Sequence, residues 1–473
     1  MASTASLPLP KTPAWVINSL IGGFIFLICW GMSIAYWRST RGTPGSGEFV
    51  ACLFAIPLAL TCVAWLGARL ILPRIAASMP AAAAAKPAAV PPAPPTVMPM
   101  AILASALRSP HGASAEELAA AIAGGKARAD LDRELIDDEG FPVMAARSND
   151  ASDAALQEEI VEWLAQHGMA GLPFSEAQWR ALILASAVTA DLTLSAIGAL
   201  AGTESGLPML QLVPILPLDW DAAQRQAACA WLRQMVERSG WASDNLLLAA
   251  EPPANASAPT PSAVFSRLAH DTMQKAQPLA ALVVACASHI DQETVDKWAT
   301  AGKLFTSSRP QGLIPGEGAA GLVLADLEHA RAKQLTDFVL LDPLEEAQHG
   351  VSADDIKRVD PNVLEELTKR AVKRRNIDFT DVVMIVADTG HRSSRVLELM
   401  GYASVTLPQL DDSGDIICVG VACGSCSTVP FITALALARH YVLERFGPVV
   451  CVSNEDALLR QAALIQPDGA VPE

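Results

Sequence analysis

The sequence has few basic residues for its length. Its 473 residues include 34 lysines and arginines against 50 aspartates and glutamates, which gives a formal net charge of −16. Nucleic-acid binding needs a basic surface that neutralises phosphates, so this balance argues against a nucleic-acid partner. P-loop, GxGxxG and HExxH patterns are also absent, and these are plain sequence signs of nucleotide and zinc sites. We therefore expect no cofactor and no metal.

Cysteine is present, but its spacing excludes a disulfide framework. The nine cysteines are scattered, and three of them lie in apolar N-terminal runs. Disulfide frameworks belong to small secreted domains, whereas scattered thiols indicate a reducing compartment such as the cytosol. The single CxxC pair, Cys423 and Cys426, does not predict a zinc site, because zinc needs four ligands and no second pair follows.

Two long apolar runs lie near the N-terminus, at residues 15–37 and 49–72. The first has no charged residue over 23 positions, and the second has only Arg69. Each is long enough to cross a hydrocarbon core of about 30 Å at about 1.5 Å per residue. A cleaved signal peptide is the alternative, but the run is too long and a second span follows at once. We expect residues 1–76 to form a transmembrane hairpin.

Basic residues flank the two spans rather than occupy the loop between them. The loop 38–48 holds two, and the outer flanks hold four. This asymmetry predicts that both ends of the hairpin lie in the cytoplasm. The alanine- and proline-rich residues 77–97 then predict a semi-rigid, extended linker. Together these features predict a bacterial inner-membrane protein whose soluble body lies in the cytoplasm.

The body, from about residue 98 to the C-terminus, alternates apolar strand candidates with amphipathic helices. Residues 100–125 predict a strand, a Pro-His-Gly turn and a helix that begins with a capping box of Ser114 and Glu117. Strands are expected at residues 209–216, 245–250, 279–285, 318–325, 382–387, 416–421 and 448–453, and helices at 220–238, 262–276, 361–375 and 428–445. This alternation, with continuous Val/Ile/Leu runs, indicates an α/β body with a largely parallel sheet.

The most distinctive segment is RPQGLIPGEGAAGLVLAD, residues 309–326. Gly316, Glu317 and Gly318 form a turn directly before an apolar strand. With SPHG before it, ALVVACASHI ahead of it and a strand ending in DTG after it, this segment resembles the β-ketoacyl synthases. The resemblance covers about residues 98–470. It implies a five-layer αβαβα thiolase-like body with halves at 98–330 and 331–473, in which Glu317 is a structural carboxylate.

The resemblance also implies a nucleophilic cysteine and two histidines, and the sequence lacks all three where they are expected. The elbow at residues 259–262 reads PTPS, and the first histidine position reads DTG, with His391 nearby. The second histidine position, in GVACGSCS, has none. The last strand runs into VSNEDALLRQ, without the family's glycine-rich loop. The segment 246–262 is also short for the family's elbow strand, which pairs across the dimer.

Two groups of residues remain as weak site candidates. Cys423 and Cys426 precede the expected helix 428–445, whose dipole would lower a thiol pKa, and His391 could pair with them. Small buried packing residues are the alternative. The cluster Lys369, Arg370, Lys373, Arg374 and Arg375 could bind an acidic partner, such as an acyl carrier protein, or anionic lipid. A solvated helix face is the alternative there.

Two hypotheses follow, and they leave open whether the protein is an enzyme. The first is a membrane-anchored, catalytically inactive synthase-like scaffold, accessory to a bacterial envelope assembly such as type VI secretion. The second is a diverged acyltransferase that uses Cys423 or Cys426 on thioesters linked to acyl carrier protein or coenzyme A. Expected partners are the membrane, envelope proteins or acyl carrier protein. Because the resembled family usually dimerises, a homodimer is also expected.

Overall fold

The protein is described by a computed structural model that covers residues 98–469 apart from 201–206, 250–259, 275–279, 333, 336, 356–358 and 413, and also Trp30 and Met32. The expected spans 15–37 and 49–72 and the linker 77–97 lie outside the described residues, apart from Trp30 and Met32. The described part from residue 98 onward, here called the body, belongs to a single compact unit.

One large sheet forms the framework of the body. Its strands follow the order β11-β10-β12-β13-β8-β1-β7-β6-β4-β5, and β9 pairs with β13. They are β1 (Met100–Arg108), β4 (Leu210–Ile215), β5 (Leu246–Leu248), β6 (Ala280–Ser288), β7 (Glu317–Asp326), β8 (Val339–Leu341), β9 (Glu345–Gln348), β10 (Met384–Ala387), β11 (Ile416–Cys418), β12 (Val449–Ser453) and β13 (Leu459–Pro467). The two halves join where β1 pairs with β7 on one side and with β8 on the other.

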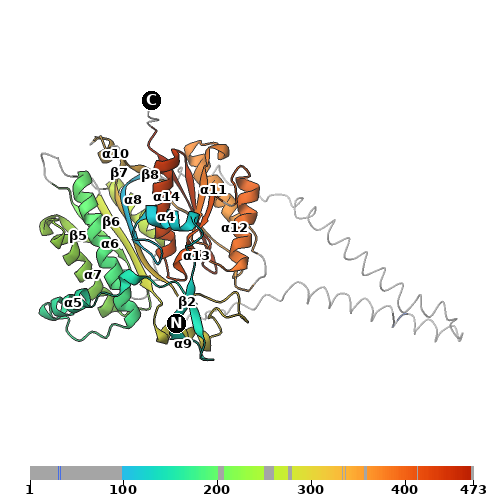
Figure 1. The fold of residues 1–473 in the computed structure, drawn as a ribbon. Coiled ribbons are helices and arrows are strands. Elements are labelled where there is room, and N and C mark those ends of the chain that lie inside the picture. Colours follow the sequence, from blue (N-terminus) through green and yellow to red (C-terminus); the bar gives the residue numbers. More distant parts are fainter. Residues whose placement is uncertain are drawn as a thin grey trace, which may run out of the picture. The chain divides into compact units, whose positions relative to one another are not determined.

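Helices lie on both outer faces and between the two halves of the sheet, which gives five layers (Figure 1). The outer layer of the first half holds α6 (Glu176–Leu200) and α7 (Ala222–Arg238). The middle layer holds α8 (Pro261–Gln274) and α14 (Val429–Arg445), and the outer layer of the second half holds α11 (Asn362–Arg375) and α12 (Ser393–Thr406). A separate apolar cluster fills each helical layer against its strands.

The burial of α14 follows from its sequence. Its residues VPFITALALA are apolar on every side, and all of them are buried. A helix that is apolar all round needs neighbours all round, so it belongs in the middle layer. By contrast, α7 is amphipathic and lies outside, with a capping box in which Asp221 and Gln224 bond each other's backbone N–H.

Shorter elements complete the body. A hairpin of β2 (Asp130–Ile136) and β3 (Pro142–Ala145) packs with α9 (Gln292–Thr300) below the main sheet in Figure 1. The remaining α-helices are α4 (Ala115–Ala123), α5 (Ala154–Gln166), α10 (Leu327–Ala332) and α13 (Val419–Cys423). As expected, Ser114 caps α4 by accepting a hydrogen bond from the Glu117 N–H, but the Glu117 carboxylate accepts from Ala113 rather than from Ser114.

The expectation of a largely parallel sheet is wrong, because the sheet is mixed. Parallel pairing joins β4 to β5 and β6, and β10 to β11 and β12. The pairs of β1, β7, β8 and β13 are antiparallel. Strands such as β7 are continuously apolar because helices cover both faces, and that burial does not depend on strand direction.

Two further corrections concern the ends of strands. The expected strand 416–421 stops at Cys418, and α13 begins at Val419. Gly420 crosses the Asp388 backbone so closely that a Cβ there would lie 2.2 Å from its carbonyl oxygen, so the chain turns at this point. The expected strand 245–250 is limited to the three residues of β5 at the edge of the sheet, and residues 250–259, which lead to the elbow, lie outside the described residues.

Among the described residues, α6 is the one helix long and apolar enough to cross a membrane. Its most apolar 18-residue window is 61% buried, and the helix packs on β1, β6 and β7. Such burial is typical of a core helix in a folded body, and α6 takes that place in the outer layer of the first half.

Candidate functional site

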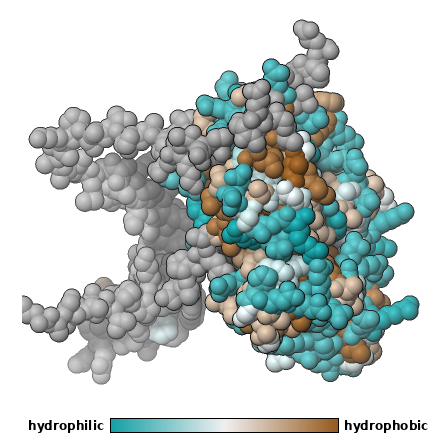
Figure 2. All heavy atoms as spheres, turned by 90° about the vertical axis from the view of Figure 1, so that its left-hand side faces the viewer, coloured by the Kyte–Doolittle hydropathy of each residue, from teal (hydrophilic) through white to brown (hydrophobic). Residues whose placement is uncertain are grey.

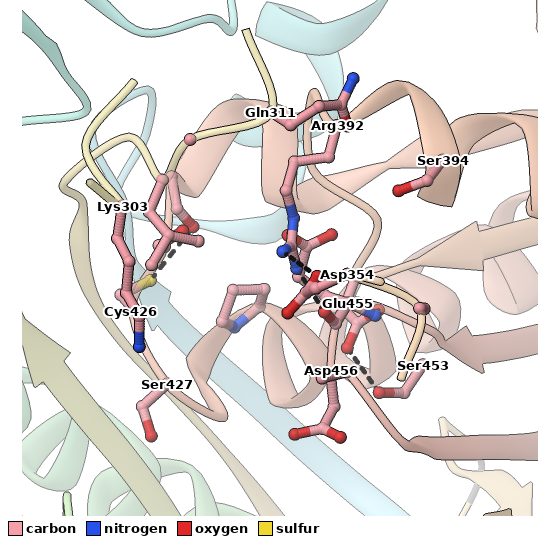
Figure 3. Close-up of a pocket in the computed structure, with 18 of the residues that line it drawn as sticks. Lys303, Gln311, Asp354, Arg392, Ser394, Cys426, Ser427, Ser453, Glu455 and Asp456 are labelled. Carbon is pink, nitrogen blue, oxygen red and sulfur yellow. Dashed lines mark hydrogen bonds and ion pairs between the residues drawn. The ribbon is translucent and has the colours of Figure 1, made fainter. Parts of the chain in front are cut away.

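A cavity of about 1230 Å³ opens where the two halves of the body meet. One wall comes from the loop between α9 and β7, here called the rim loop (residues 302–313). The other walls come from the starts of α8, α12 and α14 and from the turn between β12 and β13. Figure 3 shows residues that line this cavity. Its polar lining includes Thr260, His289, Lys303, Arg309, Gln311, Asp354, Asp355, Asp388, Arg392, Ser393, Ser394, Ser427, Thr428, Ser453, Glu455, Asp456 and Gln461.

The start of α8 lies in this cavity, at the position expected for a nucleophile. Thr260 caps the helix by accepting a hydrogen bond from the Ala263 N–H at 3.2 Å, and Pro261 is the first helical residue. Both residues line the cavity. In the described part of this elbow, a threonine and a proline therefore stand where thiolate chemistry would need a cysteine.

Asp388 directly follows β10 and occupies the position expected for the first histidine. Its carboxylate accepts hydrogen bonds from the Ser453 hydroxyl at 2.5 Å and from the Asn454 and Glu455 N–H groups at 2.8 and 3.2 Å. Burial raises the pKa of Asp388 to about 6. The carboxylate thus ties the end of β10 to the β12–β13 turn.

His391 lies outside the cavity lining and does not form the expected Cys–His pair. Its ring packs edge-on against Phe305 of the rim loop, with 5.0 Å between ring centres. Burial lowers its pKa, so the neutral imidazole is favoured in this packing. The His391 Nε2 has no hydrogen-bond partner among the described residues, so neither thiol is paired with it there.

The two thiols of CGSC are buried, and the expectation of a lowered thiol pKa is wrong. Cys423 is 1% exposed, and Cys426 is fully buried although it borders the cavity. Burial raises the pKa of Cys423 to about 12 and that of Cys426 well above its usual value. The cost of burying a thiolate raises the thiol pKa by more than the dipole of α14 could lower it. The Cys426 thiol points toward the Cys423 and Gly424 carbonyl oxygens, which favour the protonated form.

An ion-pair cluster at the start of α12 forms the opposite wall of the cavity. The Arg392 guanidinium lies 2.8 Å from both the Glu455 and the Asp354 carboxylates, as Figure 3 shows. The fully buried Arg395 forms a second ion pair with the Asp354 carboxylate, at 2.6 Å. These ion pairs neutralise the charge of Arg392 within the protein, and they hold the β12–β13 turn against α12.

Sequence reasoning missed several residues that line the cavity. His289 directly follows β6, and its Nδ1 lies 2.6 Å from the Ser425 carbonyl oxygen. Lys303 and Arg309 come from the rim loop, and Arg392 from the start of α12. The signal for His289 is a polar residue at the end of an apolar strand, whereas the others meet only through the tertiary fold.

The expected turn at Gly316, Glu317 and Gly318 is wrong: Gly316 forms a β-bridge with Ala146, and Glu317 and Gly318 are the first residues of β7. Glu317 is nevertheless a packing residue, as expected. The Glu317 carboxylate is fully buried and accepts from Arg180 at 2.6 and 2.8 Å, from the Ser148 N–H at 2.7 Å and from the Ser288 hydroxyl at 2.9 Å. All its strong acceptor positions are used by protein donors. The carboxylate thus joins α6, β6 and β7 at one point.

The basic cluster of α11 is largely paired within the body. Lys369 pairs with Glu365, Arg375 pairs with Asp342, and both Arg370 and Arg374 reach Glu345. Only the exposed Lys373 has no ion pair within the described residues. This neutralisation weakens the attraction that the cluster would exert on an acidic partner.

The donor set of the described residues does not suggest a metal centre. No group of three or more His, Cys, Asp or Glu side chains in the described chain is arranged to hold a metal ion. The carboxylates of the cavity are instead bonded to arginines, hydroxyls and backbone N–H groups.

Comparisons with known proteins bear on the fold. No protein-family model and no curated protein matches the sequence. Solved structures do match: the ketosynthase from module 6 of the bacillaene synthase of Bacillus subtilis 168 has a TM-score of 0.54 at 13% identity, over 78% of this chain and 72% of that one. The body has a ketosynthase-like fold.

Two further structures give the same result. The ketosynthase from module 1 of the bacillaene synthase of Bacillus amyloliquefaciens FZB42 has a TM-score of 0.51 at 12% identity, over 80% of this chain and 75% of that one. The oxazolomycin ketosynthase domain of Streptomyces albus JA3453 has the same TM-score and coverages at 11% identity. At such identities the likeness establishes the ketosynthase-like fold and leaves activity to the residues of the site.

Proposed function

We propose that this protein is a membrane-anchored, ketosynthase-like binding module that does not carry out condensation. The observation that carries the proposal is the start of α8, where Thr260 and Pro261 face the cavity at the position of a nucleophile. Asp388 stands at the first histidine position and is bonded to Ser453 and to two backbone N–H groups. A cavity with these residues can hold a ligand but has no described group that forms a covalent acyl intermediate at the elbow.

The alternative, an acyltransferase that acts through Cys423 or Cys426, is disfavoured by the burial of both thiols. The thiolate is the reactive form of cysteine, and the pKa of Cys423 is raised to about 12. Neither carrier protein-linked nor coenzyme A-linked thioesters would meet an accessible thiolate in the conformation described. The binding role therefore comes first.

We predict that the full-length chain, purified in detergent, does not condense acyl and malonyl thioesters of acyl carrier protein. The rate should fall at least about 10⁴-fold below that of an active ketosynthase, because loss of a nucleophile and its partners costs several orders of magnitude. Release of carbon dioxide from the malonyl thioester measures the reaction. Turnover that disappears in Cys423→Ser or Cys426→Ser would overturn the proposal and favour the acyltransferase.

We extend the proposal to the inner membrane, with the body on the cytoplasmic side. The support is the pair of apolar runs at residues 15–37 and 49–72 and the basic residues outside them. A reporter active only in the periplasm should function when fused after Gly45 and fail when fused after Pro99. A reporter that functions after Pro99 and fails after Gly45 would contradict the cytoplasmic location of the body. A scaffold so placed would suit an envelope assembly such as type VI secretion, which co-purification of the full chain would test.

A homodimer is part of the same proposal. β5 is the end strand of the sheet, and its Leu247 and Leu248 side chains are 48% and 37% exposed. Figure 2 views this side of the body and shows apolar surface interspersed among polar residues. No described strand pairs with the outer edge of β5, and such an edge with exposed leucines is suited to pairing with a second copy. Sedimentation velocity of the purified chain distinguishes a dimer from a monomer.

A further inference from the structure

The carboxylates of the cavity are mostly committed to donors within the protein. Asp388 accepts from Ser453, Asn454 and Glu455, and Glu455 accepts from Arg392 and the Gly390 N–H. Asp354 is shared by Arg392 and Arg395. Asp456 accepts from the Leu458 and Leu459 N–H groups. A ligand would find little unused acceptor capacity on this wall.

The rim loop presents the opposite situation. Lys303 and Arg309 both line the cavity and are exposed, and neither has an ion-pair partner among the described residues. The loop is held in shape by the pairing of Leu304 with Leu313, and the Gln311 side chain donates to the Ser393 hydroxyl on α12. The backbone that carries the two cations is therefore held beside the cavity by a structured loop.

Uncommitted hydrogen-bond donors lie on the same side as Lys303. Figure 3 shows Lys303 and Ser427 together on one side of the cavity, with Arg392, Asp354 and Glu455 on the other. Ser427 is exposed, and within the described chain no group accepts from the N–H groups of Ser427 and Thr428. The unpaired N–H groups of Ser427 and Thr428 and the unpaired charge of Lys303 therefore lie on one wall. The hydrogen-bond acceptors of the other wall are mostly bonded to donors within the protein.

We propose that this cavity binds a small anionic ligand, a phosphate ester or a carboxylate, through Lys303 and Arg309 of the rim loop and the donors of residues 427 and 428. This inference rests on the proposed binding role and names the class of its ligand. On the opposite wall Arg392 and Arg395 together balance the charges of Asp354 and Glu455, so these groups offer no free positive charge to an anion. Asp355, Asp388 and Asp456 line the cavity without an ion-pair partner among the described residues and should weaken the binding of an anion.

The test is calorimetric titration of the full-length chain in detergent, with inorganic phosphate in one arm and citrate in the other. We expect at least one of the two to bind with an affinity that falls as sodium chloride rises. Lys303→Glu with Arg309→Glu should weaken binding at least about tenfold, as expected when charged partners of a bound ion are reversed. Binding of phosphate alone would indicate a phosphate ester as the ligand class, and binding of citrate alone would indicate a carboxylate. Binding of both would support a general anion site.

Matched variants separate this site from general charge effects. Lys297→Glu reverses one cation, as each rim-loop substitution does, but on the exposed face of α9 outside the cavity lining, and should leave the affinity within about twofold. Asp355→Asn should tighten binding. A melting temperature for each variant confirms folding, and Lys303→Gln with Arg309→Gln replaces the reversed pair if that pair unfolds.

Two results would overturn the inference. One is the absence of phosphate and citrate binding to the wild-type chain at tens of millimolar. The other is binding that the rim-loop variants leave unchanged. Condensation is measured in a separate assay, so a chain that neither condenses nor binds anions overturns only this inference, whereas a chain that condenses overturns the proposed function.

Discussion

Glu317→Gln should destabilise the body by about 3–5 kcal/mol, the usual cost of removing one partner of a buried ion pair. The Glu317 carboxylate is fully buried and binds Arg180, which is itself 8% exposed in its side chain. The glutamine amide would turn a donor toward the donors of Arg180 or Ser288 and leave the guanidinium without its countercharge. The measurement is the shift in apparent free energy of unfolding of the full chain in urea.

The control for this substitution is Glu116→Gln, which removes a carboxylate from the exposed first turn of α4. It should change stability by no more than about 0.5 kcal/mol. A double-mutant cycle with Arg180→Gln should give a coupling energy of more than about 1 kcal/mol, because the two side chains share two hydrogen bonds. Equal effects of Glu317→Gln and Glu116→Gln would show that the buried pair does not stabilise the start of β7.

The sequence predicted the helices that have clear periodicity and caps. The starts and ends of α7, α8, α11 and α14 lie within two residues of the expected ranges. α6 was missed because its alanine-rich 25 residues show little contrast between faces, since most of the helix is buried. β13 was missed for a different reason: Arg460 and Gln461 read as loop residues, whereas Arg460 is buried against Glu398 at 2.7 Å.

The site was less predictable than the fold. Residues 260–262 and Asp388 could be placed by counting from neighbouring strands, because each follows a buried apolar run at a short, fixed distance. Rim-loop residues such as Lys303 could not, since their distance from the cavity depends on how the loop packs across the start of α12. The Cys–His expectation was wrong because sequence proximity to a helix start says nothing about burial, and burial decides the thiol pKa.

The ketosynthase-like fold does not depend on the catalytic residues of the family. The middle layer of α8 and α14 joins the strands of both halves into one apolar cluster, to which Cys423 and Cys426 belong as packing residues. The same packing leaves the cavity open at the helix starts, so a binding role can persist on an unchanged scaffold.

Gly316→Val should disrupt the body more severely than any other single change considered. A Cβ at Gly316 would lie 2.0 Å from the Cys423 carbonyl oxygen and 2.8 Å from the Gly424 Cα, so it would meet backbone that cannot rotate away. The chain before β7 crosses the turn after α13 here, and the Ser425 N–H donates to the Ile314 carbonyl beside the crossing. We expect a loss of more than about 4 kcal/mol, at the upper end of single-residue effects.

The measurement is the melting temperature of the full chain together with the labelling rate of Cys423 and Cys426 by a thiol reagent. Both thiols are buried in the wild type, so faster labelling would report that the crossing has opened. Gly350→Ala is the control, because a Cβ there meets nothing within 4 Å and the residue has no left-handed backbone. If Gly316→Val melts at the temperature of Gly350→Ala with both thiols protected, the close crossing does not constrain this corner of the cavity. Its shape would then have to come from Glu317 and the ion pairs of Arg392 alone.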